Sequence, residues 1–346
     1  MIGRRTREGT VVVQTAYLGN VLLTTPLLSA LAARYGPVDV VAQPVSAEVL
    51  EGHPAVREVL AYDKRGADRG WAGVRRLARQ LRKRAYARAY LPDPSWRAAT
   101  LVFAARVPHR VGFSQSAAAK LYSEKVLRPL HGHESARIAT LAGIAVGDSL
   151  PPVWLGLAGP DREAAAALLA EWGIGDFVAF APGSVWGARR WSYFPELAAG
   201  LDRAVVVIGA PGDAPFAEEV VTAAPERVRS AVGAVPPRVS AALIERALAL
   251  VTNDSAALHL ATAVGTPVAA LFGPTTPALG FGPLGQDDTV LGRDDLLCRP
   301  CAQPGPAVCP LEHHRCMREL DVAQVADALA SIIRRVEERR AIRTGG

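Results

Sequence analysis

The chain has 346 residues, of which half are hydrophobic, and its formal net charge at neutral pH is +6. This length predicts about two domains, and the apolar content is enough for two sizeable cores. No run of about 18 apolar residues occurs, which excludes an ordinary transmembrane helix. The N-terminal residues lead directly into an expected strand and lack the apolar core of a signal peptide, so we expect a cytoplasmic protein.

Strands and helices alternate along the chain, which predicts an α/β fold. A segment rich in Pro and Gly at 147–160 predicts a linker between two such series. The pattern therefore predicts two doubly wound, Rossmann-like domains. We expect strands at 10–16, 38–42, 87–91, 110–113, 177–181, 204–208, 247–251 and 267–272. We expect helices at 21–34, 161–172, 195–201, from Ser255 to about 264, and at 321–340, with a basic helix inside 71–90.

The segment 251–275 is the most informative part of the chain. An apolar strand ends at Val251, and the polar residues after it, up to Ser255, favour a helix N-terminus. Gly265 ends that helix, and a buried strand follows. A helix that begins at the carboxyl end of a parallel strand offers free amides to a phosphate. His259 lies one turn past Ser255 and would add a donor. The alternative is an ordinary βαβ unit with no ligand.

Polar residues also follow the two strands expected at 177–181 and 204–208. Ser184 lies in a Pro-Gly-Ser loop whose amides can meet phosphate oxygens. Arg189 and Arg190 would bind a diphosphate, or they form a solvated pair at the start of a helix. Asp213, in a Gly-rich turn, would accept ribose hydroxyls, or it makes an ordinary Asx turn.

All four cysteines cluster within 19 residues, in the pattern Cys-x2-Cys-x7-Cys-x6-Cys, with His313 and His314 inside it. A reducing cytoplasm argues against stable disulfides. The spacing suits a structural zinc held by four thiolates, or by three thiolates and a histidine. Unligated thiols and disulfides remain the alternatives. The cysteines are Cys298, Cys301, Cys309 and Cys316.

Several motifs, taken in order, resemble glycosyltransferase family 9, the bacterial lipopolysaccharide heptosyltransferases. The family's Asp-Thr/Ser-Gly-x-x-His motif is similar to Asp254, Ser255, Ala256 and His259, with Ala256 in place of the usual Gly. A Gly-Thr-Pro turn and a Leu-Phe-Gly-Pro segment follow it, as in the family. The other similar motifs are Gly19-Asn20 with Pro26, Pro108-His109-Arg110 (as in second-heptose transferases), Pro182-Gly183-Ser184 with Arg189-Arg190-Trp191, and Gly209 to Asp213.

The resemblance implies the GT-B fold, in which two Rossmann-like domains face each other across a cleft. Residues 1–155 would bind the acceptor and residues 156–320 the nucleotide sugar, and the C-terminal helix within 321–346 would pack back on the first domain. The implied reaction is an inverting, metal-independent transfer of heptose from ADP-heptose to a lipopolysaccharide inner-core acceptor. No cofactor would be required, any zinc would be structural, and nucleic acid would not be a partner. The donor-binding residues would be Ser184, Arg189, Arg190, Asp213, Asp254, Ser255, Ala256 and His259.

The main departure from the family is Asn20, which stands where the family has the aspartate expected to act as general base. An amide cannot take a proton. Asp93, after the strand at 87–91, is the substitute we expect, although it would also suit a turn between two prolines. Gly19, Arg97 and Arg110 would bind the acceptor. Two alternatives stay open: a family member with another donor or acceptor, and a catalytically impaired protein that binds a sugar nucleotide.

Residues 71–90 contain seven basic residues and no acid, and an apolar stripe formed by Val74, Leu77, Leu81 and Ala85 makes the helix amphipathic. Its basic face would rest on the inner membrane or meet phosphates of a lipid A core acceptor. Alternatively, it stays solvated while the helix packs on the sheet. Nucleic acid fits poorly, because no binding motif accompanies the charge.

Overall fold

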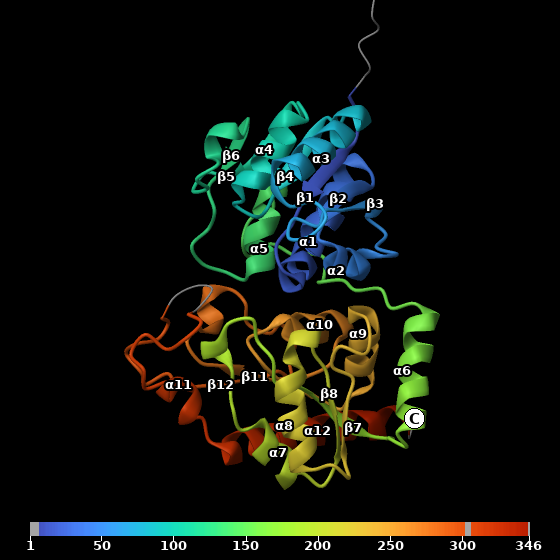
Figure 1. Cartoon of the computed structure of the whole chain (residues 1–346), viewed down its shortest axis with the longest axis vertical. Coiled ribbons are helices and arrows are strands. Elements are labelled where there is room, and N and C mark those ends of the chain that lie inside the picture. Colours follow the sequence, from blue (N-terminus) through green and yellow to red (C-terminus); the bar gives the residue numbers. More distant parts are fainter. Residues whose placement is uncertain (1–6, 302–305, 345–346) are drawn as a thin grey trace, which may run out of the picture. The chain divides into compact units, whose positions relative to one another are not determined.

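The computed structural model describes residues 7–301 and 306–344, and the chain divides into two compact units, residues 1–156 and 157–346 (Figure 1). The boundary lies one residue beyond the predicted end of the first domain. Each unit is a parallel sheet covered by helices, so the predicted α/β class is confirmed. No helix among the described residues is both long enough and apolar enough to cross a membrane.

The first unit contains a six-stranded parallel sheet with the order β3-β2-β1-β4-β5-β6. Its inner strands are short, rich in Val and buried, as expected for strands covered on both faces. The order reverses direction between β1 and β4, so the loops after these two strands leave the sheet side by side. The strands are β1 Thr10–Val13, β2 Val38–Ala42, β3 Val56–Ala61, β4 Arg88–Leu91, β5 His109–Phe113 and β6 Glu124–Val126.

Helices of the first unit fall into two groups. The buried faces of α3 and α4 share one apolar cluster with the sheet, whereas α1 packs against α5 outside that cluster. The basic segment 71–90 therefore contains a helix as predicted, and its last residues already belong to β4. The helices are α1 Leu18–Tyr35, α2 Pro44–Ala47, α3 Gly70–Arg84, α4 Trp96–Ala104 and α5 Glu134–Ala139.

The second unit repeats this architecture, with the parallel order β12-β11-β10-β7-β8-β9. Here the order reverses between β7 and β10, which pair in register from Leu250 opposite Ala179 to Thr252 opposite Ala181. The strands are β7 Phe177–Ala181, β8 Ala204–Val207, β9 Val228–Ser230, β10 Leu250–Asn253, β11 Val268–Phe272 and β12 Thr289–Gly292. The helices are α6 Gly159–Glu171, α7 Phe194–Gly200, α8 Ala214–Ala223, α9 Pro237–Arg246, α10 Ala256–Val264, α11 Arg315–Arg318 and α12 Val322–Thr344.

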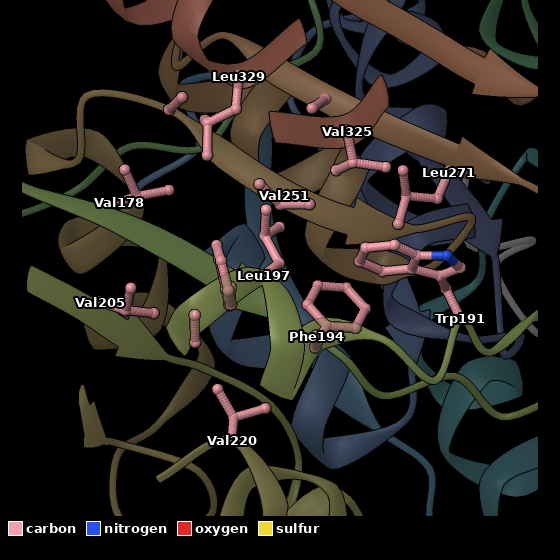
Figure 2. Close-up of a cluster of buried hydrophobic side chains, with 14 of the residues drawn as sticks. Val178, Trp191, Phe194, Leu197, Val205, Val220, Val251, Leu271, Val325 and Leu329 are labelled. Carbon is pink, nitrogen blue, oxygen red and sulfur yellow. The ribbon is translucent and has the colours of Figure 1, made fainter. Parts of the chain in front are cut away.

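The C-terminal helix α12 differs from the expectation. We expected it to pack back on the first domain, but its apolar face lies in the core of the second unit. Val325 and Leu329 are fully buried beside Val251 and Leu271 of the sheet (Figure 2). The Trp191 indole also donates a hydrogen bond of 2.9 Å to the Leu320 carbonyl just before the helix. Buried apolar side chains along one face give α12 a complete partner within its own unit.

Truncating Leu329 tests this packing. Leu329→Ala is expected to lower the free energy of unfolding by about 2–5 kcal/mol, because it leaves a cavity in a dense core. Gln324→Ala, at an exposed position of the same helix, should change it by less than about 0.5 kcal/mol. Urea unfolding of both variants measures the difference. Equal stability of the two variants would show that α12 is not part of this core.

Candidate active site

The amino end of α10 lies at the carboxyl edge of the second sheet, beside the β7–β10 switch point. Ser255 precedes the helix in an extended conformation, and its hydroxyl is 3.1 Å from the Thr252 hydroxyl rather than bonded to the helix amides. The first amides of a helix have no partner inside it. They therefore lie at the carboxyl edge of the sheet, the place where α/β proteins bind ligands and where the sequence predicts an anion.

Asp254 is the charged centre of this edge. It is only 4% exposed, and its carboxylate lies 3.0 Å from the Arg189 guanidinium and accepts a 2.6 Å hydrogen bond from the Thr275 hydroxyl. Burial raises the pKa of Asp254, and both partners act in the opposite direction. Arg189 also donates to the Asp254 carbonyl at 3.2 Å. The structure thus brings together two of the residues predicted to bind the donor, and it joins them by an ion pair and a hydrogen bond.

Asn253, which sequence reasoning passed over as one of several capping residues, joins two loops at the same edge. Its side-chain oxygen accepts the Trp191 amide at 3.0 Å, and its amide nitrogen donates to the Pro182 carbonyl at 2.7 Å. The side chain is fully buried. A buried amide with both ends bonded fixes the loop after β7 against the end of β10. The only signal in the sequence was a polar residue directly after an apolar strand.

The loop after β7 places Gly183, the residue before Ser184, close to Asp213. A Cβ placed on Gly183 would lie 2.2 Å from the Asp213 carboxyl carbon, so this close approach requires a glycine. Asp213 accepts the Ala210 amide at 2.9 Å, as in the turn alternative, and burial raises its pKa while Arg190 acts in the opposite direction. Asp213 therefore caps its own turn and also borders the loop after β7.

Arg190 lies half-buried above the Phe216 ring, with the guanidinium carbon 4.3 Å from the ring centre. A hollow of about 250 Å³ is lined by both residues, together with Pro182 of the loop after β7. On α10, His259 is buried with its ring 6.3 Å from that of Phe281, and Ala256 is half-buried at the first turn. All the predicted donor residues thus belong to the carboxyl edge of one sheet or to the helix that begins there.

In the first unit, Asn20 and Asp93 follow the neighbouring strands β1 and β4. Gly19 and Asn20 lie in the first turn of α1, where the Asn20 carbonyl accepts the Thr24 hydroxyl at 2.7 Å. Asp93 is half-buried in the loop before α4, and burial raises the pKa of its carboxyl group. The structure therefore brings both predicted catalytic residues to the same edge of the sheet.

Basic groups surround Asp93. Lys64 and Arg128 lower its pKa through their positive charges. Lys64 follows β3, and its own pKa is lowered by burial and by the charges of Arg65 and Arg97, with Asp93 opposing the shift. The predicted acceptor residue Arg97 donates to the Lys64 carbonyl at 3.2 Å. Sequence reasoning missed Lys64 and Arg128, because they follow other strands and reach Asp93 only through the fold.

Arg110 is not brought to this edge. It is the second residue of β5, toward the amino end of the strand. Its guanidinium donates to main-chain carbonyls, at 2.7 Å to Leu121 and 3.0 Å to Pro108, and lies 5.5 Å from the Phe103 ring centre. These bonds hold the start of the strand, and nothing in this geometry supports the predicted acceptor contact.

Described residues of the cysteine segment (298–316) contact the end of β11 and the loops that follow β7 and β11 at the carboxyl edge of the second sheet. Arg299 donates to the Phe272 and Thr275 carbonyls at 2.8 and 3.1 Å, and the Cys301 amide donates to Pro274 at 2.8 Å. His314 contacts the Ala188 carbonyl at 2.7 Å.

All four cysteines of this segment are free thiols, and Cys316 is buried. Burial and the neighbouring thiols raise the pKa of Cys316 to about 11, with Arg299 acting in the opposite direction. Among residues 7–301 and 306–344, no group of three or more His, Cys, Asp or Glu side chains is arranged to hold a metal ion.

Comparisons with known proteins identify the family. The model of glycosyltransferase family 9 (heptosyltransferase) matches residues 74–309, more than half of the chain. The chain is 27% identical to lipopolysaccharide heptosyltransferase 2 of Salmonella typhimurium over 290 residues, which cover 77% of this chain and 83% of that protein. It is also 28% identical to lipopolysaccharide heptosyltransferase 1 of Pseudomonas aeruginosa, over 90% of each chain.

Two solved structures share the fold. The structure of E. coli ADP-heptose LPS heptosyltransferase II has a TM-score of 0.79 and 23% identity, covering 95% of this chain and 99% of that one. A glycosyl transferase family 9 protein from Veillonella parvula has a TM-score of 0.83 and 22% identity, covering 95% and 98%. The chain belongs to glycosyltransferase family 9, and it is a glycosyltransferase with the GT-B fold.

Proposed function

We propose that this family 9 glycosyltransferase moves a heptose from ADP-heptose to an inner-core sugar of lipopolysaccharide, with inversion and without a catalytic metal. The observation that carries the proposal is the amino end of α10, with the Asp254–Arg189 pair beside it at the switch point of the second sheet. The curated relatives are heptosyltransferases of lipopolysaccharide or lipooligosaccharide. Their names supply the sugar and the acceptor class, which the geometry alone would leave open.

The donor diphosphate would lie at the α10 amides and the loop of Gly183 and Ser184. Arg189 is largely enclosed, so its charge acts in a medium of low polarity. Arg190 would add a second cation, and Asp213 would face the ribose from the adjacent turn. As the leaving diphosphate gains charge, these fixed donors stabilise it without a metal ion.

The acceptor hydroxyl would be activated in the first unit. Its oxygen forms the new bond to the anomeric carbon while its proton passes to the Asp93 carboxylate. The bond from that carbon to the diphosphate oxygen breaks, and the electron pair leaves with ADP. Asn20 would orient the hydroxyl by a hydrogen bond, because an amide can donate and accept but cannot take the proton. Lys64 and Arg128 would help to keep Asp93 ionised and would attract an anionic acceptor.

Binding of ADP tests the donor site. His259→Ala is expected to weaken ADP binding by roughly 10- to 150-fold, since a hydrogen bond to a charged group contributes about 1.5–3 kcal/mol. Arg189→Lys should also weaken it, because an ammonium keeps the charge but loses the fork that contacts Asp254 and the ligand. Arg334→Ala, at an exposed position of α12, is the matched control for charge. Calorimetry showing wild-type affinity in both site variants would remove this site.

Separate substitutions of Asp93 and Asn20 test which residue acts as the general base. Asp93→Asn should lower kcat about 10²- to 10⁴-fold without changing ADP affinity, while Asn20→Asp should be tolerated or raise turnover. Since burial raises the pKa of Asp93, wild-type kcat should fall as the pH drops through that raised value, and Asp93→Asn should lose this limb. Asp148→Asn, at an exposed position, is the control.

Two outcomes of these substitutions would contradict the proposal that Asp93 is the general base. Wild-type turnover by Asp93→Asn would exclude Asp93 as the base. Turnover by Asn20→Asp alone, with an inactive wild type, would support the catalytically impaired protein instead.

A structural zinc in the cysteine segment stays a separate proposal, motivated by the spacing of the four thiols. It predicts about one equivalent of zinc in protein purified without a His-tag, and a lower melting temperature after treatment with a strong chelator. Turnover should not depend on added divalent ions. Metal analysis and thiol titration measure this. Metal-free protein with four titratable thiols and an unchanged melting temperature would contradict it.

A further inference from the structure

The outer side of α3 carries a continuous basic stripe. Val74, Leu77 and Leu81 are buried against the sheet, so the opposite side of the helix faces solvent. On that side, Trp71, Arg75, Arg79 and Lys83 follow one another at intervals of four residues, which places them in one line along the helix. Arg76 and Arg82 are also exposed and flank this line.

These charges are not neutralised by their surroundings. Between residues 69 and 123 the only acid is Asp93, which lies in the loop before α4. On α3, ion pairs occupy Arg76, with Asp68, and Arg84, with Glu58. Within the described ranges, the structure pairs none of the remaining basic residues of α3 with an acid. They are Arg75, Arg79, Arg82 and Lys83. A face on which four cations lack an acidic partner fits a surface with dense negative charge.

Aromatic side chains accompany these cations. Trp71, at the start of α3, is 66% exposed. The neighbouring helix α4 packs beside α3 (Figure 1) and exposes Trp96 and Phe103, each at 53%. Trp96 and Phe103 are seven residues apart, so they share one side of α4, and Leu101 and Val102 are buried. Large exposed aromatic residues are unfavourable in water, yet Trp is enriched where an apolar phase meets water.

We propose that this face of the first unit, formed by the outer sides of α3 and α4, docks on a bilayer rich in anionic phospholipid. The basic stripe would meet the headgroup phosphates, and Trp71, Trp96 and Phe103 would enter the boundary between headgroups and acyl chains. None of the residues on this face takes part in the proposed donor or base chemistry. The inference therefore stands independently of the proposed function, and turnover of a water-soluble acceptor should not depend on this face.

Vesicle binding by the full chain tests the face. Wild-type protein is expected to float with vesicles of phosphatidylcholine and phosphatidylglycerol, not with phosphatidylcholine alone, and high salt should weaken binding. The triple variant Arg75→Gln, Arg79→Gln, Lys83→Gln should bind at least tenfold more weakly, since each cation lost near such a surface weakens binding by a factor on the order of five. Trp71→Ser should weaken binding to the same vesicles with net charge unchanged.

The matched control removes the same charge elsewhere. The variant Arg246→Gln, Arg318→Gln, Arg334→Gln changes three exposed residues of the second unit and should bind like the wild type. Circular dichroism and melting temperature confirm that every variant is folded. Equal loss of binding in both triple variants would reduce the effect to net charge and overturn the proposal. Tighter binding of a single-stranded oligonucleotide than of vesicles, lost in the α3 variant, would overturn it in favour of nucleic acid.

Discussion

The carboxyl edge of the second sheet, where we propose that the donor binds, depends on one buried carboxylate. Asp254 follows β10, its ion-pair partner Arg189 follows β7, and its hydrogen-bond partner Thr275 follows β11. One side chain therefore ties together the loops of three adjacent strands. A buried charge costs several kcal/mol of solvation and is tolerated only when its partners are in place. Removing either partner would leave that cost uncompensated, so these contacts favour one arrangement of the loops that would hold the diphosphate.

Asn253 and Gly183 extend this arrangement without charge. The Asn253 amide binds the loop after β7 at two points, Pro182 and Trp191, and the missing side chain of Gly183 lets Asp213 approach the main chain. Preorganised donors need no rearrangement when a substrate arrives, which is where an electrostatic site gains most of its effect. The departure at Ala256 is compatible with this edge, because it lies half-buried at the first turn of α10 and leaves the amides of that turn in place.

Local sequence patterns predicted the helices and strands better than they predicted which elements and side chains lie next to each other. The strands at 38–42 and 177–181 were predicted with the bounds that the structure has, because short runs of Val, Phe and Ala between turn signals have few other solutions. The succession of β10, α10 and β11 was also predictable, since these elements are consecutive in the sequence. By contrast, the docking of α12 was predicted wrongly. Its apolar stripe indicates a buried face but does not say which sheet covers it, and resemblance to a family decided the question incorrectly. Lys64 and Arg128 were missed for the same reason, because their proximity to Asp93 arises only when separate strands pair.

The cysteine segment lies outside the expected chemistry, yet it makes hydrogen bonds to the segments that we propose carry that chemistry. Sequence reasoning left open whether the segment holds a structural zinc, free thiols or disulfides, and gave it no part in the transfer chemistry. Its contacts instead end on the carbonyls of the donor loops: Arg299 and Cys301 on the loop after β11, and His314 on the turn before Arg190. Each contact pairs a main-chain oxygen of the end of β11 or of a loop at this edge. Because the segment and the donor loops share these hydrogen bonds, a change that loosens the segment also releases the carbonyls beside Thr275 and Arg189. If the second unit binds a nucleotide as proposed, the order of the described part of this segment would therefore contribute to the free energy of that binding.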